Sequence, residues 1–385
     1  MFIREIKSQL LQAVSSFPAV VLTGPRQSGK TTLLKTLFPN YRYINLEFPD
    51  ELSLVQEDPR GVIDANLNRG IIFDEAQRYP ELFSYIQGYV DRNPQKGKFI
   101  LSGSQNFLLA NKVSQSLAGR AAIIELFPLT YSEYCSHPQS EKNISLWRWL
   151  YCGTYPRPYQ EHLDTKLWYK SYIQTYLERD LRFLAKVQDL AQFQRFLQFC
   201  AARHGQILNL TQLAQDAGIT RVTAQNWLSI LQASYIVYLL TPYYENFNKR
   251  LIKSPKLYFY DPAIVCQLLG IDSAEHLEIH SMRGAIFEGY IISELLKQPH
   301  NRGEMTHIFY WRDSHGLELD CLIEQLGKIE AIEIKATMTL RPDLFSGLKK
   351  FDLLARSKIQ QLKLVYAGDA NENIGGIKIL SWREL

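Results

Sequence analysis

The feature that most constrains the fold of this 385-residue chain is a glycine-rich turn between an apolar run and a helical segment. The stretch GPRQSGKT, from Gly24 to Thr31, matches the pattern G-x-x-x-x-G-K-[ST] at every position. It follows the apolar run AVVLT and precedes TTLLKTLF, which has the pattern of a helix. The glycines let the backbone wrap a phosphate at the positive end of a helix. The motif predicts a strand–loop–helix unit of an α/β nucleotide-binding domain, and a chance glycine turn is the alternative.

Short apolar runs recur through the first third of the chain and alternate with helical segments. The five runs are Phe17–Thr23, Tyr43–Leu46, Gly70–Phe73, Lys98–Ser102 and Ala121–Leu126. Runs rich in Val and Ile, without polar alternation, are typical of buried strands in a parallel sheet that is covered on both faces. Because strands alternate with helices, we predict an α/β layered domain over residues 1–135.

The phosphate-binding loop predicts ATP and Mg²⁺ as ligands. Lys30 would neutralise the β- and γ-phosphates, and Thr31 would place its hydroxyl on Mg²⁺. The residues expected to contact the nucleotide are Gly24, Pro25, Arg26, Gln27, Ser28, Gly29, Lys30, Thr31, Thr32 and Ser104. The apolar strand GIIFDE ends in two carboxylates, the Walker B pattern, so we expect Asp74 to hold Mg²⁺ through water and Glu75 to be the general base. An exposed acidic strand end is the alternative for this pair.

Two further candidates follow from position in the domain. The strand KFILSGSQ ends at the edge expected to face the nucleotide, so Ser104 or Gln105 could sense the γ-phosphate, and Ser104 is favoured. Arg120 precedes the last strand. It is either a catalytic arginine finger, which a neighbouring subunit of a homo-oligomer would supply, or a surface arginine that closes a loop.

Several of these stretches together resemble a known family. In chain order they are GPRQSGKTTLL, YINLE, IIFDEAQRYPELF, LSGSQNFLL, SLAGR and FPLTYSEY. They resemble the bacterial and archaeal ATP-binding proteins that join an AAA-type domain to a C-terminal domain of long-unassigned function. The later stretches SYIVYLLTPYYENFNKRLIKSPKLYFYD and GAIFE resemble that C-terminal domain. The resemblance covers nearly the whole chain and implies an AAA-type P-loop ATPase, but it implies no second activity.

The middle of the chain is predicted to be helical and then to form a winged helix. Residues 136–205 are rich in Trp and Tyr and have a helical pattern, with a loop at Cys152–Pro158 because of its glycine and prolines. Residues 206–268 are predicted as the winged helix-turn-helix. Its elements are the helix Leu210–Ala217, a turn at Gly218, a second helix capped by Thr220, and the strands Tyr235–Leu240 and Lys256–Tyr260 around the loop Tyr243–Pro255. In the second helix the spacing predicts a buried face of Ala224, Trp227, Leu228 and Leu231.

The winged helix predicts DNA as a partner. Arg221 and Gln225 lie on the face of the second helix opposite the apolar one, together with Ser229. Between residues 241 and 260 the chain has four basic residues, Lys249, Arg250, Lys253 and Lys256, and one acid, Glu245. Aromatic residues that could contact bases are interleaved with them: Tyr243, Tyr244 and Phe247. A purely structural or protein-contacting winged helix is the alternative.

Residues 269–385 begin a last α/β unit, with a helix over Met282–Lys297 and strands near 307–312, 317–324, 329–337 and 361–366. If the turn of the hairpin is Leu326-Gly327, residue 325 pairs with 328 and Asp320 lies opposite Glu333. Lys335, two residues on, projects from the same face as Glu333. The other face is predicted to be core, with Leu319, Cys321, Ile323, Ile332 and Ile334.

This constellation resembles the PD-(D/E)xK nucleases. Facing carboxylates repel, and a shared Mg²⁺ or Mn²⁺ would relieve that cost. The resemblance implies Asp320, Glu333 and Glu288, from the preceding helix, as metal-binding residues and Lys335 as a catalytic lysine. One alternative is a solvent-facing hairpin in which Lys335 pairs with Glu318; another is a one-residue slip of register.

Composition sets outer limits on the function. The net charge of +4 permits a nucleic-acid partner without requiring one. The five scattered cysteines indicate neither a disulfide framework nor a zinc site, and no apolar run suits a signal peptide or a membrane span, so we expect a cytoplasmic protein with no membrane partner. The predicted function is ATP-dependent action on DNA, with hydrolysis coupled to a C-terminal metal-dependent nuclease. The rival is a nucleotide-switched DNA- or protein-binding regulator whose nuclease-like domain is inactive.

Overall fold

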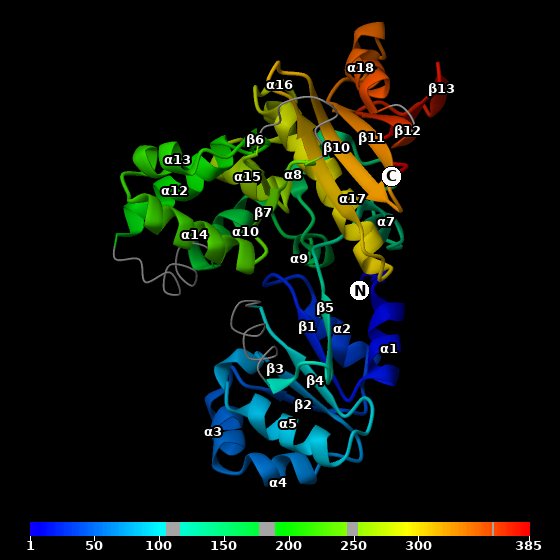
Figure 1. Ribbon diagram of the computed structural model, residues 1–385. Helices are drawn as coiled ribbons and strands as arrows, with labels where there is room; N and C mark the ends of the chain where they lie inside the picture. Colours follow the sequence, from blue (N-terminus) through cyan, green and yellow to red (C-terminus); the bar gives the residue numbers. More distant parts are fainter. Residues whose placement is uncertain (105–115, 177–188, 245–252, 356–357) are drawn as a thin grey trace.

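The computed structural model describes residues 1–104, 116–176, 189–244, 253–355 and 358–385. In Figure 1 the N-terminal domain, in blue and cyan, lies at one end of the molecule. Residues 131–385, which we call the C-terminal body, lie at the other end and contain two further sheets.

The N-terminal domain is built on an all-parallel sheet in the order β2-β3-β4-β1-β5. The strands are β1 Ala19–Thr23, β2 Arg42–Asn45, β3 Ile71–Asp74, β4 Phe99–Ser102 and β5 Ala121–Glu125. All five predicted strands are confirmed within two residues at either end, and so is their parallel arrangement. The three inner strands are buried along their whole length, whereas the edge strands β2 and β5 are partly exposed. The expectation of five buried strands is therefore wrong for the two edges.

Helices cover both faces of this sheet. On one face, α1 Lys7–Ser16 and α2 Lys30–Leu37 pack with Val20 and Leu22 of β1. On the other face, three helices pack with Val21 of β1: α3 Pro49–Glu57, α4 Pro59–Asp64 and α5 Leu82–Arg92. A short 3₁₀ helix, Ala76–Arg78, follows β3.

The body starts with short helices and the predicted helix-turn-helix. The first helices are α7 Tyr131–Cys135, α8 Leu146–Cys152, α9 Pro156–Gln160, α10 Thr165–Tyr172 and α12 Leu190–Ala202. The loop predicted at Cys152–Pro158 is confirmed only for residues 153–155. Cys152 ends α8, and Pro156 occupies the first turn of α9, where a missing N–H costs no hydrogen bond. The helix-turn-helix elements are β6 Gln206–Ile207, α13 Leu210–Ala217, α14 Arg221–Ala233, β7 Val237–Leu240 and β8 Lys256–Phe259.

The predicted details of this region are confirmed element by element. Gly218 ends α13 in the left-handed conformation, and the Thr220 hydroxyl accepts a hydrogen bond from Thr223 N at 3.1 Å. The apolar face predicted for α14 is buried. The strands form an antiparallel sheet in the order β6-β8-β7. The identification of these elements as a winged helix stays a prediction.

The C-terminal sheet is mixed, in the order β13-β14-β12-β11-β10-β9. Its strands are β9 His307–Arg312, β10 Glu318–Gln325, β11 Lys328–Lys335, β12 Ile359–Tyr366, β13 Glu372–Ile374 and β14 Ile377–Ser381. The remaining helices are α15 Pro262–Leu268, α16 Ala274–Ile279, α17 Arg283–Asn301 and α18 Ser346–Ala355, with a 3₁₀ helix at Pro342–Phe345. The helix α17 lies along one face of the sheet (Figure 1), and α18 packs on the other face. The helices α15, α16 and α18 and the strands β13 and β14 are not predicted from the sequence.

One prediction about this sheet is wrong. Cys321, Ile323, Ile332 and Ile334 share one face, as expected, and join the core that contains α17. Leu319 joins the opposite core, against α18. The register with β9 shifts between Leu319 and Leu322, and such a bulge turns the side chains before it to the other face.

A single hydrophobic core joins all the parts of the body. It contains Phe2 from the N-terminus, Trp149 of α8, Trp227 of α14 and Ile291 of α17. Segment boundaries at residues 135, 205 and 268 stay predictions, but residues on either side of each of them share this core.

Candidate functional site

The P-loop has the predicted strand–loop–helix setting. The residues Gly24, Pro25, Arg26, Gln27, Ser28 and Gly29 lie between β1 and α2, and Lys30, Thr31 and Thr32 form the first turn of α2. Gly24 has φ +143°, and a Cβ there would lie 2.2 Å from the Leu126 carbonyl oxygen. Gly29, at φ +97°, is the N-cap of α2. These two positions require glycine for conformation and, at Gly24, for space.

The lysine and one hydroxyl of the loop suit an anionic ligand. Lys30 is buried, and its Nζ donates to the Gly24 and Pro25 carbonyl oxygens at 2.8 Å each. Burial lowers the pKa of Lys30 to about 8, although the charges of Glu75 and Asp74 raise it. The buried Ser28 hydroxyl has no hydrogen-bond partner among the described residues. A phosphate would supply both the opposite charge and the missing acceptor, so the loop fits the predicted nucleotide.

The predicted Mg²⁺ residues lie side by side. Thr31 Oγ1 donates to Asp74 Oδ2 at 2.6 Å, across the gap between α2 and the end of β3. The same carboxylate accepts from the Tyr43 hydroxyl at 2.7 Å, and its Oδ1 accepts from the Ser102 hydroxyl. Tyr43 and Ser102 were missed in the sequence. The only signal for them was their position on β2 and β4, the two strands that flank β3.

The candidate general base has its own polar neighbours. Glu75 directly follows β3 in the left-handed conformation, with φ 54°. Its Oε2 accepts from Gln77 Nε2 and lies 3.4 Å from Ser104 Oγ. Ser104 is therefore beside the base, at the edge where the sequence analysis placed it, whereas Gln105 lies outside the described residues.

Arg120 lies at the opposite edge of the sheet from the P-loop of its own chain. It precedes Ala121, which pairs with Ala19 at the start of β1, whereas the P-loop follows the end of β1. Its guanidinium contacts Asp91 of α5 and the Ala118 carbonyl oxygen. Within one chain this is a surface arginine that closes a loop. The finger role requires a second subunit and stays a prediction.

Three side chains from outside the predicted nucleotide-contact set contact the P-loop or the strand residue just before it. Arg4 Nη1 donates to the Ser28 carbonyl oxygen at 2.7 Å. Tyr172, at the end of α10, donates to the Arg26 carbonyl oxygen at 3.4 Å. The Tyr235 hydroxyl, after α14, lies 2.8 Å from Thr23 Oγ1. No motif marks these residues, because each is far from the loop in the sequence.

Arg4 also connects the loop to the body. Its Nη2 donates to the Phe127 carbonyl oxygen at 2.6 Å, and its Nε lies 3.1 Å from the buried Glu133 carboxylate. Glu133 belongs to the capping box of α7, whose first N–H, at Tyr131, donates to Glu294 of α17 at 2.9 Å. A chain of polar contacts therefore runs from the P-loop to the long helix of the body.

The predicted acidic pair of the C-terminal sheet is close together. The Leu326-Gly327 turn and the pairing of Gln325 with Lys328 are confirmed. Lys335 Nζ lies 2.6 Å from Glu333 Oε1 and 3.4 Å from Asp320 Oδ2. These two carboxylate oxygens are therefore at most about 6 Å apart, and both contact the Lys335 ammonium.

Burial and charge perturb this cluster. Glu333 and Asp320 are both buried. Burial, followed by the charge of Asp320, raises the pKa of Glu333 to about 8, against the opposing effect of Lys335. Glu333 Oε2 has no hydrogen-bond partner among the described residues. Such a shifted carboxyl group at a polar cluster is a feature of functional sites as well as of structural ion pairs.

The contacts of Lys256 contradict two expectations, one for Lys256 as a DNA contact and one for Glu288 as a metal-binding residue. Lys256 is 3% exposed, and its Nζ lies 3.0 Å from Glu288 Oε1 and also contacts Glu318. It cannot serve the wing loop as a DNA contact. Glu288, expected as a metal-binding residue, pairs with Lys256 instead and also accepts from the Tyr258 hydroxyl. Burial and the charge of Asp320 raise the pKa of Glu288 to about 7.

The alternative pairing of Lys335 with Glu318 is also wrong, because Glu318 contacts Lys256 and Arg312. The predicted three-carboxylate metal site is not assembled either. In the part of the chain that the structure describes, no three His, Cys, Asp or Glu side chains are grouped to hold a metal ion. The ammonium groups of Lys335 and Lys256 neutralise Asp320, Glu333 and Glu288 in the place of a cation.

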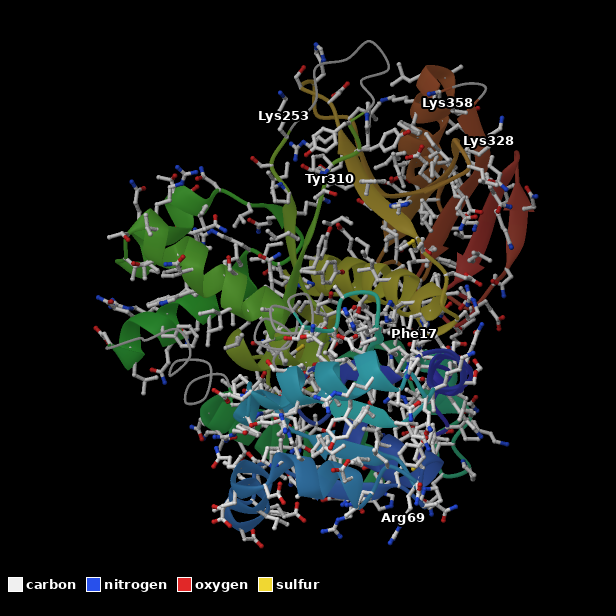
Figure 2. The ribbon with its side chains drawn as sticks, turned by 60° about the horizontal axis from the view of Figure 1, so that its bottom comes forward. Phe17, Arg69, Lys253, Tyr310, Lys328 and Lys358 are labelled. Atoms are coloured by element: carbon white, nitrogen blue, oxygen red, sulfur yellow. The ribbon has the colours of Figure 1, made fainter. Side chains whose placement is uncertain are left out.

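The predicted DNA-contacting surface is only partly within the described residues. Arg221 and Gln225 are exposed on α14. Tyr243 is buried, where its N–H donates to the Tyr310 carbonyl oxygen at 2.7 Å, so it is not available to contact bases. Figure 2 shows Lys253 where the described chain resumes, beside Tyr310. Glu245, Phe247, Lys249 and Arg250 lie outside the described residues.

Comparisons with known proteins give the N-terminal domain a family. Residues 16–135 match the AAA domain family. Residues 143–275 and 283–385 match two domains of unknown function, DUF8612 and DUF4143. None of the helices in the described ranges has the length and apolar character that spanning a membrane demands.

Relatives extend over nearly the whole chain. The uncharacterized proteins Rv2008c of Mycobacterium tuberculosis and Mb2031c of Mycobacterium bovis are each 32% identical over 370 residues, which is 95% of this chain and 80% of each relative. Among solved structures, the Walker-type ATPase paby2304 of Pyrococcus abyssi is 16% identical, with a TM-score of 0.41 over 70% of this chain and 96% of that protein.

Proposed function

Because this chain belongs to the family of the mycobacterial proteins Rv2008c and Mb2031c and carries an AAA-type ATPase domain, we propose that it hydrolyses ATP with Mg²⁺ and transmits its nucleotide state to a DNA-binding body. The observation that carries the first part is the 2.6 Å hydrogen bond between Thr31 and Asp74, beside the buried Lys30. It brings the P-loop and the Walker B strand together at one site.

The residues of this site have separate roles in hydrolysis: phosphate binding, metal binding and activation of water. Mg²⁺, when bound, supplies positive charge to the β- and γ-phosphate oxygens. Lys30 and the backbone N–H groups of the loop bind the phosphates, and Thr31 and Asp74 would hold the metal. Glu75 polarises the attacking water and accepts its proton. Ser104, beside Glu75, is placed to respond to the γ-phosphate.

Transmission to the body is supported by the three side chains that contact the β1–P-loop segment. Arg4, Tyr172 and Tyr235 each hold a different residue of the strand–loop segment, and Tyr172 and Tyr235 belong to the body. A loop that changes its backbone when phosphates bind therefore changes contacts of α10 and of the segment after α14. A nucleotide shifts the equilibrium between two conformations of the loop only if it binds one of them more tightly than the other.

The test is ATP turnover of the purified chain with and without Mg²⁺, compared with Lys30→Ala. We expect turnover that requires Mg²⁺ and that Lys30→Ala abolishes, because the phosphates lose their main cationic partner. Equal turnover in both proteins would refute the assignment of the site. DNA binding measured with ATP, with ADP and without nucleotide tests the second part, and identical affinities would refute transmission.

A second candidate function is metal-dependent cleavage of nucleic acid by the body. It is favoured by one observation, the buried Asp320 and Glu333 on either side of Lys335, with Glu333 Oε2 unpaired among the described residues. For cleavage a divalent cation must take the place of the Lys335 ammonium. The rival, a binding module without cleavage, is favoured by the two lysines that already neutralise the cluster. Plasmid cleavage with Mg²⁺ or Mn²⁺, in the presence and absence of ATP, separates them: cleavage that Asp320→Asn removes supports the nuclease.

A further inference from the structure

Tyr43 contributes the second hydroxyl on the carboxylate oxygen that Thr31 contacts. It lies in β2, next to β3, and its hydroxyl donates to Asp74 Oδ2 at 2.7 Å. Asp74 is 3% exposed, so the donors on this oxygen are protein groups held in fixed positions. Thr31 approaches it from α2 and Tyr43 from β2.

Lys35 connects the two donors. It lies four residues after Thr31 in α2, so the two side chains lie on the same face of that helix. Its Nζ is 3.9 Å from the centre of the Tyr43 ring. A cation over the face of an aromatic ring is attracted to it, and this contact holds the ring against α2. The Asp74 carboxylate is thus contacted by Thr31 of α2 and by Tyr43, whose ring packs against Lys35 on the same face of α2.

The hydroxyl of Tyr43 is the donor in this hydrogen bond, because a carboxylate oxygen can only accept. Thr31 has a second task at the same site, because its oxygen is predicted to bind Mg²⁺. The Tyr43 hydroxyl is therefore suited to orient Asp74 both with and without the metal.

We propose that Tyr43 is a positioning residue for ATP hydrolysis, which fixes the Asp74 carboxylate in the orientation that holds Mg²⁺, and that Lys35 keeps the Tyr43 ring in place. The inference rests on the proposed function of the P-loop. Hydrogen-bond partners of a metal-holding carboxylate typically change metal affinity 10- to 100-fold when removed. Tyr43 acts through Asp74, so its removal should alter the Mg²⁺ dependence before anything else.

Tyr41 offers a matched control. Its hydroxyl also donates at 2.7 Å, but to the Gly97 carbonyl oxygen. Tyr41→Phe and Tyr43→Phe each remove one hydroxyl from the same part of the domain. Only Tyr43→Phe removes a donor from Asp74.

The experiment measures ADP affinity by calorimetry at increasing Mg²⁺ concentration, and ATP turnover over the same range. We expect Tyr43→Phe to bind metal-free ADP with the affinity of the wild type. It should need an about tenfold higher Mg²⁺ concentration to reach half of the maximal change in ADP affinity and in ATP turnover. Lys35→Met should need roughly two- to fivefold more, as befits one cation–π contact. Tyr41→Phe should match the wild type.

An unchanged Mg²⁺ requirement in Tyr43→Phe overturns the inference, and so does an equal shift in Tyr41→Phe, which would indicate a general loss of structure. A lower Mg²⁺ requirement also overturns it, because the hydroxyl would then compete with the metal. If wild-type protein shows no Mg²⁺-dependent nucleotide binding or turnover, the proposed function itself fails. That outcome is distinguishable, because it is seen without any substitution.

Discussion

Tyr235 and Thr23 share a hydrogen bond of 2.8 Å, which joins the segment after α14 to the residue that precedes the P-loop. The Tyr235 hydroxyl also donates to Glu125 Oε1 at 2.8 Å. Because the carboxylate can only accept, the single tyrosine proton goes to Glu125, and Thr23 donates to the tyrosine oxygen. Tyr235 has φ 58°, a left-handed conformation that costs a non-glycine residue roughly 1 kcal/mol or more. The surrounding contacts therefore hold it in place.

We predict that Tyr235→Phe uncouples the end of α14 from nucleotide binding. The variant keeps the ring but loses both hydrogen bonds, which should also lower the free energy of unfolding by about 1 to 3 kcal/mol. Hydrogen exchange of residues 221–235, with and without a non-hydrolysable ATP analogue, should differ in the wild type and be the same in the variant. Tyr238→Phe is the control, since that hydroxyl donates within the body to Gly289 at 3.4 Å. A full nucleotide response in Tyr235→Phe would contradict the prediction.

Glu75→Gln should separate ATP binding from hydrolysis. The amide keeps the size of the side chain and leaves Thr31 and Asp74 in place, but it cannot accept a proton from water. General-base catalysis is typically worth 10²–10⁴ in rate, so single-turnover hydrolysis should fall by about that factor while ATP affinity is retained. Turnover at the wild-type rate would show that another group activates the water.

Much of this site can be predicted because its motifs are local. Gly24 to Thr31 and the Asp74-Glu75 pair are each contiguous in the sequence, and the turn at Leu326-Gly327 fixes the hairpin register. Both turn residues have positive φ, which suits a two-residue hairpin turn.

Lys256 shows why the rest could not be predicted. In the sequence it belongs to a basic run with Lys253 and counts as a surface charge. In the structure Lys256 is buried and pairs with Glu288 of α17 and Glu318 of β10. Which distant strand covers a residue is not encoded in its neighbours along the chain. The contacts of Arg4 and Tyr235 with the P-loop segment were missed for the same reason.

If Arg120 is a finger supplied in trans, hydrolysis should require assembly. Turnover per chain should rise with protein concentration, and Arg120→Ala should remove that rise, since such fingers are worth roughly 10³–10⁵ in rate. Asp91→Asn is the control: it breaks the ion pair within the chain but leaves the guanidinium. A specific activity independent of concentration, in a protein that stays monomeric with ATP, would exclude the finger.

For DNA binding, the triple substitution of Lys249, Arg250 and Lys253 by Ala should weaken affinity for all sequences. Each lost phosphate contact lowers the slope of log affinity against log salt by about 0.9 on duplex DNA. Arg69→Ala is the control, because Figure 2 shows Arg69 at the opposite end of the molecule from Lys253. An unchanged slope in the triple variant would indicate that this loop contacts protein.

The acidic cluster should make stability depend on pH. The pKa of Glu333, about 8 in the folded protein, lies above its ordinary value of 4.5. Between these values the folded chain binds more protons than the unfolded chain, so Glu333 makes the free energy of unfolding fall as pH rises. Glu333→Gln should therefore be less stable than the wild type at pH 5.5. At pH 8.5 this difference should be smaller or reversed. The difference in the free energy of unfolding between the two proteins should change by at least about 1 kcal/mol from one pH to the other.

Urea unfolding at both pH values measures this change, with Glu330→Gln as the control on the same strand, where Lys363 pairs with Glu330. A divalent cation should act in the opposite direction. If Mg²⁺ or Mn²⁺ binds Asp320 and Glu333, it displaces the extra proton, so it should stabilise the wild type more at pH 8.5 than at pH 5.5 and should not stabilise Asp320→Asn. Metal-independent unfolding at both pH values, together with the predicted effect of Glu333→Gln, would identify the cluster as a proton-binding structural pair. The C-terminal body would then be a binding module, because without a bound cation Asp320 and Glu333 cannot activate water for cleavage of a phosphodiester.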